Sequence, residues 1–312
     1  MGEIRIEHGP YTGQSDTLVC VDGSYIIYHA LYAAVNTWMK ESPYSDILSE
    51  ADVTDPSFER IDLVSYPDFL DSLKGELIED LRKICGIVSE FNTTMGSSTF
   101  GDILFVLDPE HGSMSRSWRY KVYPEYKGHR KSSNERKPFD VYSAFSRGLE
   151  MLKGEDGMCR RFGMRTVLAD GAEADDIIAT MFMDSENGHF NKLLIASDKD
   201  YLQLKGVTQI NIFGDHIEIE QPYPDLIKVT PETYLIAKII TGDTSDNITQ
   251  VFNRVGYKTA VKKYLTDLDF LNESLESDPV AMEKFNRNTR LIDFGRIPKK
   301  IREAIRTAVA RS

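Results

Sequence analysis

Cysteine is scarce in this chain, and its spacing excludes two kinds of stabilised fold. Only three cysteines occur in 312 residues, Cys20, Cys85 and Cys159, and no two form a Cys-x-x-Cys pair. A disulfide framework and a cysteine-based zinc site are therefore not expected. Apolar runs long enough for a membrane span, which needs roughly 20 residues, are also missing. Residues 1–14 are polar and mixed in charge, unlike a signal peptide.

Positive charge is in deficit overall but concentrated in one place. The chain has 37 Lys and Arg against 49 Asp and Glu, a net charge of −12. Phosphate binding favours Lys and Arg, so this average argues against a nucleic-acid partner. Between residues 115 and 137, however, eight basic residues face only two acids. Four aromatic residues are interleaved with them: Trp118, Tyr120, Tyr123 and Tyr126. A basic run is usually a solvated face, but this mixture favours a segment that follows phosphates and stacks on bases.

Short apolar runs alternate with helical periodicity from about residue 15 to 220. Runs at 17–22, 102–108, 165–169, 192–196 and 208–213 are predicted to be strands. The last is expected to form a hairpin with residues 216–220. Helices are predicted at 25–39, 68–91, 139–151, from Ala174 onward, 231–240 and 279–310. This order indicates an α/β fold with a mostly parallel central sheet flanked by helices.

Acidic residues follow the predicted strands repeatedly. Asp22 and Asp108 each end a strand, and Asp198 and Asp200 follow another. Three acids crowd the start of the helix after residues 165–169: Glu173, Asp175 and Asp176. Helix capping alone could explain those three. Because the carboxyl ends of parallel strands meet at one edge of a sheet, we expect these acids to converge there.

A convergent acid cluster requires cations. With Asp243 and Asp246, nine carboxylates would share one crevice, where like charges raise each other's pKa. Oxygen ligands without His or Cys select Mg²⁺ or Mn²⁺ over zinc. Nine acids exceed what one Mg²⁺ uses, so two ions are predicted. Two metals beside a basic, aromatic segment suit in-line attack of water on a phosphodiester.

Six motifs, in order over residues 17–265, resemble the 5′-nuclease superfamily, which includes flap endonucleases and the 5′-nuclease domain of bacterial DNA polymerase I. They are Val21-Asp22-Gly23, Leu107-Asp108, Tyr126-Lys127-Gly128-His129-Arg130, Glu173-Ala174-Asp175-Asp176, Ser197-Asp198-Lys199-Asp200 and Gly242-Asp243-Thr244-Ser245-Asp246-Asn247. Residues 285–298 resemble the replication ribonuclease H of tailed phages, a member of this superfamily. The resemblance implies an Mg²⁺-dependent 5′-3′ exonuclease and flap endonuclease that removes RNA primers during phage DNA replication.

The same resemblance implies an organisation and a set of partners. It places a PIN-like nuclease core at 15–225, with an insertion at about 40–67 and a helical arch at about 115–138. A helical DNA-binding and C-terminal region follows at 226–312, with a helix-three-turn-helix element at 230–265. Implied partners are branched or nicked duplex DNA and RNA–DNA hybrids, together with a single-strand binding protein and a sliding clamp. A monomer is expected, in the cytoplasm of a host cell if the chain is phage-encoded.

Carried over position by position, the resemblance assigns roles. Asp22, Asp108, Glu173 and Asp175 would hold the first Mg²⁺, and Asp198, Asp200 and Asp243 the second, with Mn²⁺ able to substitute. Asp176 and Asp246 would be further or water-mediated ligands. Lys127 and Arg130 would contact the scissile phosphate and act with Asp175 and Asp200 in catalysis, and Tyr126 would stack on a terminal base. The remaining predicted DNA contacts are Arg116, Arg119, Lys131, Gly256, Lys258 and Thr259.

One departure and two alternatives qualify this interpretation. Residues 249–256 lack two glycines of the family loop and carry one extra residue, so the family's monovalent-cation site cannot be carried over. A non-catalytic, structure-specific DNA-binding protein with structural metals is one alternative; the distant origins of the acids, without an EF-hand-like run, disfavour it. The other is a small-molecule phosphohydrolase with Asp22 as nucleophile, where Ser24 replaces the usual second Asp.

Overall fold

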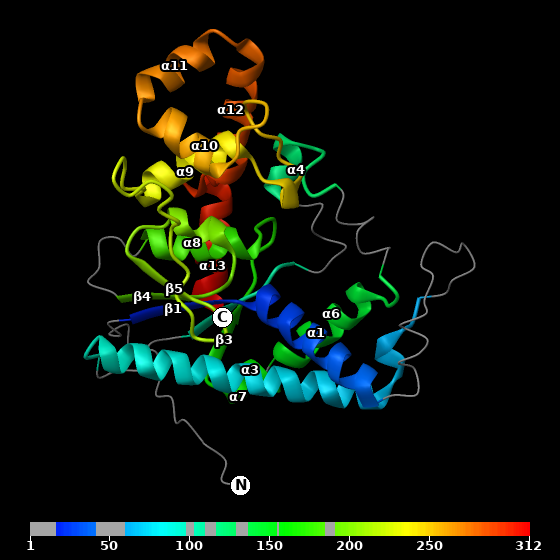
Figure 1. The fold of residues 1–312 in the computed structure, drawn as a ribbon. Helices are drawn as coiled ribbons and strands as arrows, with labels where there is room; N and C mark the ends of the chain where they lie inside the picture. The colour runs from blue at the N-terminus through cyan, green and yellow to red at the C-terminus, as the bar shows by residue number, and fades with distance from the viewer. Residues whose placement is uncertain are drawn as a thin grey trace.

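A five-stranded, entirely parallel sheet lies at the centre of the molecule (Figure 1). The computed structural model describes residues 17–41, 60–97, 103–109, 117–128, 137–154, 156–184 and 191–312. The strands are β1 (Thr17–Asp22), β2 (Ile103–Val106), β3 (Met164–Val167), β4 (Asn191–Ile195) and β5 (Val207–Ile210). The predicted α/β fold is therefore confirmed.

The strand order reverses at β1. The order across the sheet is β3-β2-β1-β4-β5, so the chain moves outward through β2 and β3 and then returns to the other side of β1. At this reversal, Asp22 of β1 pairs with Val106 of β2 on one side, and Val21 of β1 pairs with Ile195 of β4 on the other. Open α/β sheets bind ligands beyond the carboxyl ends of the strands at such a reversal. The acids that follow β1, β2 and β4 are brought to this edge.

The turn from β1 into the first helix requires a glycine. A Cβ atom on Gly23 would lie 2.6 Å from the carbonyl oxygen of Val106. The side chain of Asp22 accepts a hydrogen bond from the Tyr25 amide at 3.1 Å and so closes the start of that helix. Asp22 is therefore held in place by local structure before any ligand is considered.

One face of the sheet is covered by a long helix and three shorter ones, which lie below the sheet and to its right in Figure 1. Apolar residues of α3 recur every three or four positions and are fully buried: Phe69, Leu73, Leu77, Leu81, Ile84 and Val88. The helices are α1 (Gly23–Glu41), α3 (Pro67–Thr94), α6 (Val141–Leu152) and α7 (Met158–Arg161). The predicted helices at 25–39, 68–91 and 139–151 are confirmed within a few residues.

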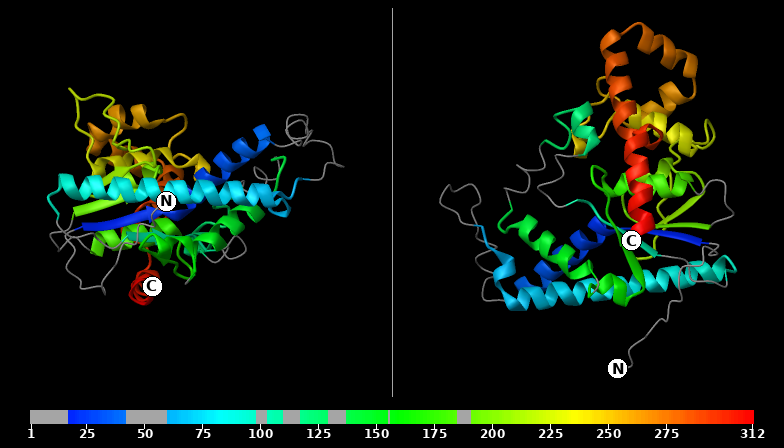
Figure 2. Two further views of the ribbon diagram at one scale, coloured as in Figure 1. Left: turned by 90° about the horizontal axis from the view of Figure 1, so that it is seen from below. Right: turned by 180° about the vertical axis from the view of Figure 1, so that it is seen from behind.

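The opposite face carries α8 (Ala174–Asp184) and α13 (Lys299–Arg311). Ile177, Ile178 and Phe182 of α8 are buried in one cluster with Ile305 of α13. The C-terminal helix thus returns to the sheet instead of staying with the other C-terminal helices. The view from behind in Figure 2 shows α13 running down to the sheet from the end of α12.

The helical lobe stands over the carboxyl edge of the sheet and has its own core around Tyr234, Val261 and Tyr264. It comprises α9 (Pro231–Thr241), α10 (Tyr257–Ala260), a π-helical turn at Val261–Leu265, α11 (Leu268–Glu276) and α12 (Pro279–Ile292). The short helix α4 (Trp118–Val122) contacts α12. No described helix is both long and apolar enough to cross a membrane.

Two sequence-based predictions of elements need correction. The helix predicted over 279–310 is two helices, because the side chain of Asp293 accepts from the Gly295 amide and a 3₁₀ turn, Phe294–Arg296, interrupts the chain. The strand predicted at 216–220 is reduced to a single bridge between Ile210 and His216. Further 3₁₀ turns lie at Leu63–Ser65, Lys199–Gln203 and Thr244–Asp246. Most of the predicted insertion, residues 42–59, falls outside the described residues.

Candidate active site

The acids that follow the strands are held by hydrogen bonds from neighbouring elements. Asp22 Oδ2 accepts from the Tyr201 hydroxyl at 3.1 Å. Asp108 Oδ1 accepts from the Ala174 amide at 2.7 Å, and its Oδ2 accepts from the Ser24 hydroxyl at 2.5 Å. These bonds fix the ends of β1 and β2 against the 3₁₀ turn after β4 and the first turn of α8.

Like charges meet at this strand edge. Burial, with the nearby charges of Asp108 and Asp198, raises the pKa of Asp22 to about 7. Burial also raises the pKa of Tyr201 well above its ordinary value, and Asp22, Asp175 and Asp198 add to that shift. Acids from the strand ends and from α8 therefore lie close enough to act on the same hydroxyl group, which donates to Asp22.

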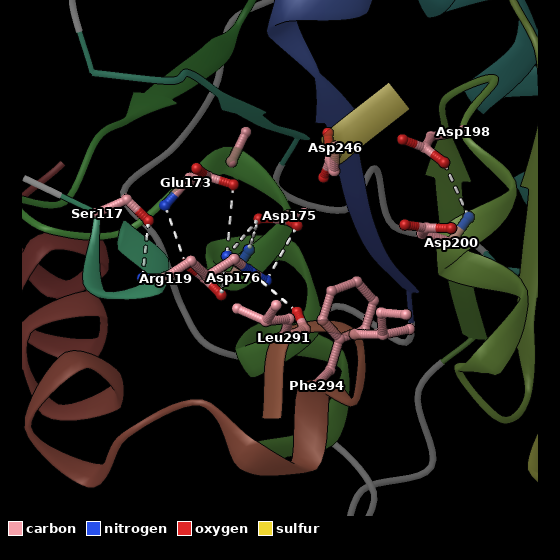
Figure 3. Close-up of polar contacts among 12 residues, drawn as sticks. Ser117, Arg119, Glu173, Asp175, Asp176, Asp198, Asp200, Asp246, Leu291 and Phe294 are labelled. Carbon is pink, nitrogen blue, oxygen red and sulfur yellow. Dashed lines mark hydrogen bonds and ion pairs between the residues drawn. The ribbon is translucent and has the colours of Figure 1, made fainter. Parts of the chain in front are cut away.

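The acids at the start of α8 are held by a buried arginine (Figure 3). Arg119 is 2% exposed. Its guanidinium lies 3.1 Å from Asp175 Oδ2, 2.9 Å from Asp176 Oδ1 and 3.4 Å from Glu173 Oε2. Its Nε donates to the carbonyl oxygen of Leu291 in α12 at 3.1 Å. All sides of this guanidinium are thus occupied by protein atoms.

The segment after α4 reaches the same acids. The Lys127 ammonium lies 2.8 Å from Glu173 Oε2. The Tyr126 hydroxyl lies 2.9 Å from both Glu173 Oε2 and Asp246 Oδ2. Burial opposes ionisation of Glu173, but Lys127 and Arg119 outweigh it and lower its pKa to about 2. Glu173 Oε1 is buried and has no hydrogen-bond partner among the described residues.

Lys238 of α9 bridges two further acids of the site, Asp200 and Asp243. Lys238 Nζ lies 2.6 Å from Asp200 Oδ1 and 3.0 Å from Asp243 Oδ2. Burial and the charge of Asp198 nevertheless raise the pKa of Asp200 to about 7. Despite its burial, Lys238 has a raised pKa because these two acids face it. The C-terminal end of α9 therefore supplies the cation of this group.

The nine predicted acids lie in three neighbouring groups that are held by different partners: Asp22 and Asp108; Glu173, Asp175, Asp176 and Asp246; and Asp198, Asp200 and Asp243. In the part of the chain that the structure describes, no three of them are arranged to hold a metal ion as they stand. Arg119, Lys127 and Lys238 already take up carboxylate oxygens. The donors still fit a hard divalent ion. All are carboxylates, Glu173 Oε1 lacks a hydrogen-bond partner among the described residues, and Asp22 and Asp200 are hard to ionise without added positive charge.

The predicted nucleic-acid contacts divide by exposure. Tyr126 and Arg119 are 1% and 2% exposed, so base stacking by Tyr126 and phosphate contact by Arg119 do not fit the structure. Both side chains turn inward because the α8 acids bind them. Gly256, Lys258 and Thr259 are exposed at the start of α10, where Lys258 lies 3.4 Å from Glu220. Arg116, Arg130 and Lys131 are outside the described residues.

Sequence reasoning missed several residues of this site. Tyr201 directly follows Asp200, and Lys238 lies one turn before Gly242-Asp243, so proximity to the acids was a usable signal for both. Trp118, whose Nε1 donates to Asp176 Oδ2 at 3.0 Å, was predicted only as a stacking residue. The Leu291 carbonyl group has no sequence signal, because its role depends on how α12 packs.

Comparison with a family model matches residues 17–224 to the "5′-3′ exonuclease, N-terminal resolvase-like domain". Flap endonuclease Xni of Vibrio parahaemolyticus is 25% identical over 225 residues, covering 70% of this chain and 77% of the relative. DNA polymerase I of Mycobacterium tuberculosis is 30% identical over 158 residues, covering 47% of this chain. The matched part spans only 16% of that polymerase.

Two solved structures share the fold. Bacteriophage T5 5′-exonuclease with bound zinc ions has a TM-score of 0.58 at 16% identity, covering 95% of this chain and 98% of that one. A bacteriophage T5 flap endonuclease in complex with DNA and metal ions has a TM-score of 0.55 at 15% identity, with the same coverage of 95% and 98%. At these identities the likeness supports the fold alone.

Proposed function

The chain belongs to the 5′-3′ exonuclease family, and from this premise we propose that it is a structure-specific 5′-nuclease that uses two Mg²⁺ ions. The observation that carries the proposal is the gathering of strand-end and helix-start acids at the β1 reversal of the sheet, beneath the helical lobe. The proposed substrates are 5′ flaps, nicked duplex DNA and RNA–DNA hybrids, as in primer removal during phage replication.

The proposed metal ligands come from all three acid groups. Asp22, Asp108, Glu173 and Asp175 would hold one ion, and Asp198, Asp200 and Asp243 the other, with Asp176 and Asp246 further out. Ions bound there would make water a better nucleophile and stabilise charge on the reacting phosphate. No side-chain general base is needed in this proposal.

The chain's own residues supply geometry and charge. Lys127 sits where its ammonium contacts Glu173 at 2.8 Å and is 10% exposed, so it can offset negative charge next to the acids. Its backbone has a φ of 55°, in the left-handed region, and its amide donates to the Asp246 carbonyl group at 3.0 Å. We propose that Lys127 and Arg130 together contact the scissile phosphate.

Duplex binding is assigned to the lobe. In this proposal the 230–265 element grips the backbone of the duplex, with the exposed start of α10 at Lys258 and Thr259 facing phosphate. The proposed organisation is a nuclease core at 15–225, which includes an arch at 115–138, followed by a helical DNA-binding region at 226–312. The protein is proposed to act as a cytoplasmic monomer, with a single-strand binding protein and a sliding clamp as protein partners.

Cleavage of end-labelled substrates tests this proposal. Wild type with Mg²⁺ should release products with 5′-phosphates from a 5′-flap duplex and from an RNA-primed duplex. Asp200→Asn should abolish cleavage and leave DNA binding largely intact, whereas Asp156→Asn, an exposed acid before α7, should cleave as wild type does. Absence of cleavage by wild type on both substrates, with binding retained, would instead support the non-catalytic DNA-binding alternative.

A further inference from the structure

Every guanidinium nitrogen of Arg119 has a partner at the candidate site. Its guanidinium contacts Glu173, Asp175 and Asp176 at 2.9 to 3.4 Å, and the Nε donates to the Leu291 carbonyl oxygen. A cation with 2% exposure cannot serve as a surface phosphate ligand. Its function must therefore lie in what it does to the acids and to α12.

The contacts of Arg119 join two parts of the fold. The three acids belong to the start of α8 on the sheet, whereas Leu291 lies near the end of α12 in the helical lobe. The planar fork of arginine can donate in several directions at once, which a lysine ammonium on a flexible stem does not reproduce. The side chain thus sets the position of the acids relative to the lobe.

The charge of Arg119 also matters to any cation that these acids bind. Three carboxylates share the site with two basic side chains, Arg119 and Lys127. We propose that Arg119 has two roles. It is a positioning residue for the nuclease reaction, and it is an internal counter-ion that pairs with the α8 acids when no divalent ion is bound and competes with such an ion for them. This inference rests on the proposed function, but it concerns metal binding and can be tested without cleavage.

Two substitutions distinguish the effect of the positive charge of Arg119 from the effect of its planar guanidinium fork. Arg119→Gln removes the competing positive charge, so half-saturating Mg²⁺ in thermal unfolding of the DNA-free protein should fall about tenfold. Binding of Mn²⁺, followed by electron paramagnetic resonance of the free ion, should tighten in parallel. Arg119→Lys keeps the charge, so its half-saturating Mg²⁺ should stay near the wild-type value.

Turnover at saturating metal reports on positioning. Because both variants lose the fork that ties Asp175 to the Leu291 carbonyl group, both should turn over about 100-fold more slowly than wild type. Arg306→Gln is the matched control. Arg306 also pairs with an aspartate on α8, with Nε lying 2.7 Å from Asp184 Oδ2, but that pair is exposed at the far end of the helix. It should change neither metal binding nor turnover.

Each result decides the inference. An Arg119→Gln variant with wild-type metal binding would overturn the counter-ion role, and an Arg119→Lys variant with wild-type turnover would overturn the positioning role. If Arg119→Gln does not fold, Arg119→Lys alone still tests positioning, and addition of Mg²⁺ should restore folding to Arg119→Gln if the counter-ion role is correct. A wild type that binds metal without cleaving nucleic acid would refute the proposed function but leave the metal comparison informative.

Discussion

The carboxylate of Asp108, beyond the end of β2, accepts a hydrogen bond from the backbone amide of Ala174 at 2.7 Å. It therefore satisfies one of the free N–H groups at the start of α8, as a capping side chain would from within the same helix. Asp108, which is proposed to bind metal, thus also stabilises the start of α8. Substitutions at this position can separate metal binding from capping.

Asp108→Asn retains an oxygen that can accept from Ala174, whereas Asp108→Ala does not. We expect unfolding in urea to show a loss of about 1 kcal/mol for the alanine variant and little change for the asparagine variant. Both should lose cleavage in Mg²⁺, because neither carries a negative charge. Equal stability losses in the two variants would contradict the capping role.

The two tryptophans make a matched pair. Trp118 Nε1 donates to Asp176 Oδ2 at 3.0 Å, and Trp38 Nε1 donates to Asp68 Oδ2 at 2.9 Å on the other face of the sheet. Replacing Trp118 by Phe should cost about 1–3 kcal/mol in denaturant unfolding, because the fully buried carboxylate of Asp176 loses a donor. Replacing Trp38 by Phe should cost less, because the exposed carboxylate of Asp68 can bind water instead. Only Trp118→Phe should reduce nuclease turnover. A comparable loss of turnover in Trp38→Phe would point to general destabilisation.

Gly23 tests the packing of β1 against β2. A Cβ there would meet the Val106 carbonyl oxygen at 2.6 Å, so Gly23→Ala should destabilise the protein by about 1–3 kcal/mol. Gly75 lies within α3, and a Cβ added to it would meet no described atom within 4 Å apart from its chain neighbours and the backbone of its own helix, so Gly75→Ala should stabilise by about 0.5–1 kcal/mol. Thermal unfolding of the two variants should shift in opposite directions.

The α6 cap predicts a pH dependence. Asp140 Oδ1 accepts from the amides of Tyr142 at 2.9 Å and Ser143 at 3.3 Å. Burial opposes ionisation, but these bonds and the Ser143 hydroxyl outweigh it and lower the pKa of Asp140 below 3.8. The stabilisation is therefore complete above the unfolded value and is lost as the pH falls through the folded value.

Asp140→Ala should accordingly cost about 1 kcal/mol at neutral pH, with the difference from wild type shrinking below about pH 4. Urea unfolding of both proteins at neutral and acidic pH measures this. Asp71→Ala, an exposed acid in α3, serves as the control. If the difference in unfolding free energy between wild type and Asp140→Ala grew on acidification, the prediction of a lowered pKa for Asp140 would be contradicted.

Periodicity and strand-end acids were enough to predict the sheet and the edge where the acids gather. The buried stripe of α3 and the runs at β1, β2 and β4 are set by local sequence, which is why their predicted positions agree with the structure. The parallel arrangement then places the acids that follow those strands at one edge without further information.

The inward orientation of basic side chains could not be predicted in the same way. Arg119 and Lys127 belong to a basic, aromatic run that is typical of a solvated or nucleic-acid-binding surface. Whether one arginine in such a run faces solvent depends on the packing of α4 against α12 and on ion pairs with the acids of α8, and both partners are distant in sequence. The return of α13 to the sheet likewise depends on tertiary packing, because Ile305 is buried beside α8.

The bond from Arg119 to the Leu291 carbonyl group spans 172 positions of sequence. Contacts of such separation form late, because most of the chain must be collapsed before they repay the entropy of closing the loop. During synthesis, α12 leaves the ribosome after every one of the nine acids. We therefore expect a nascent chain to carry all nine acids before it has the scaffold that orients them, so that cleavage competence arrives only after α12 has been synthesised.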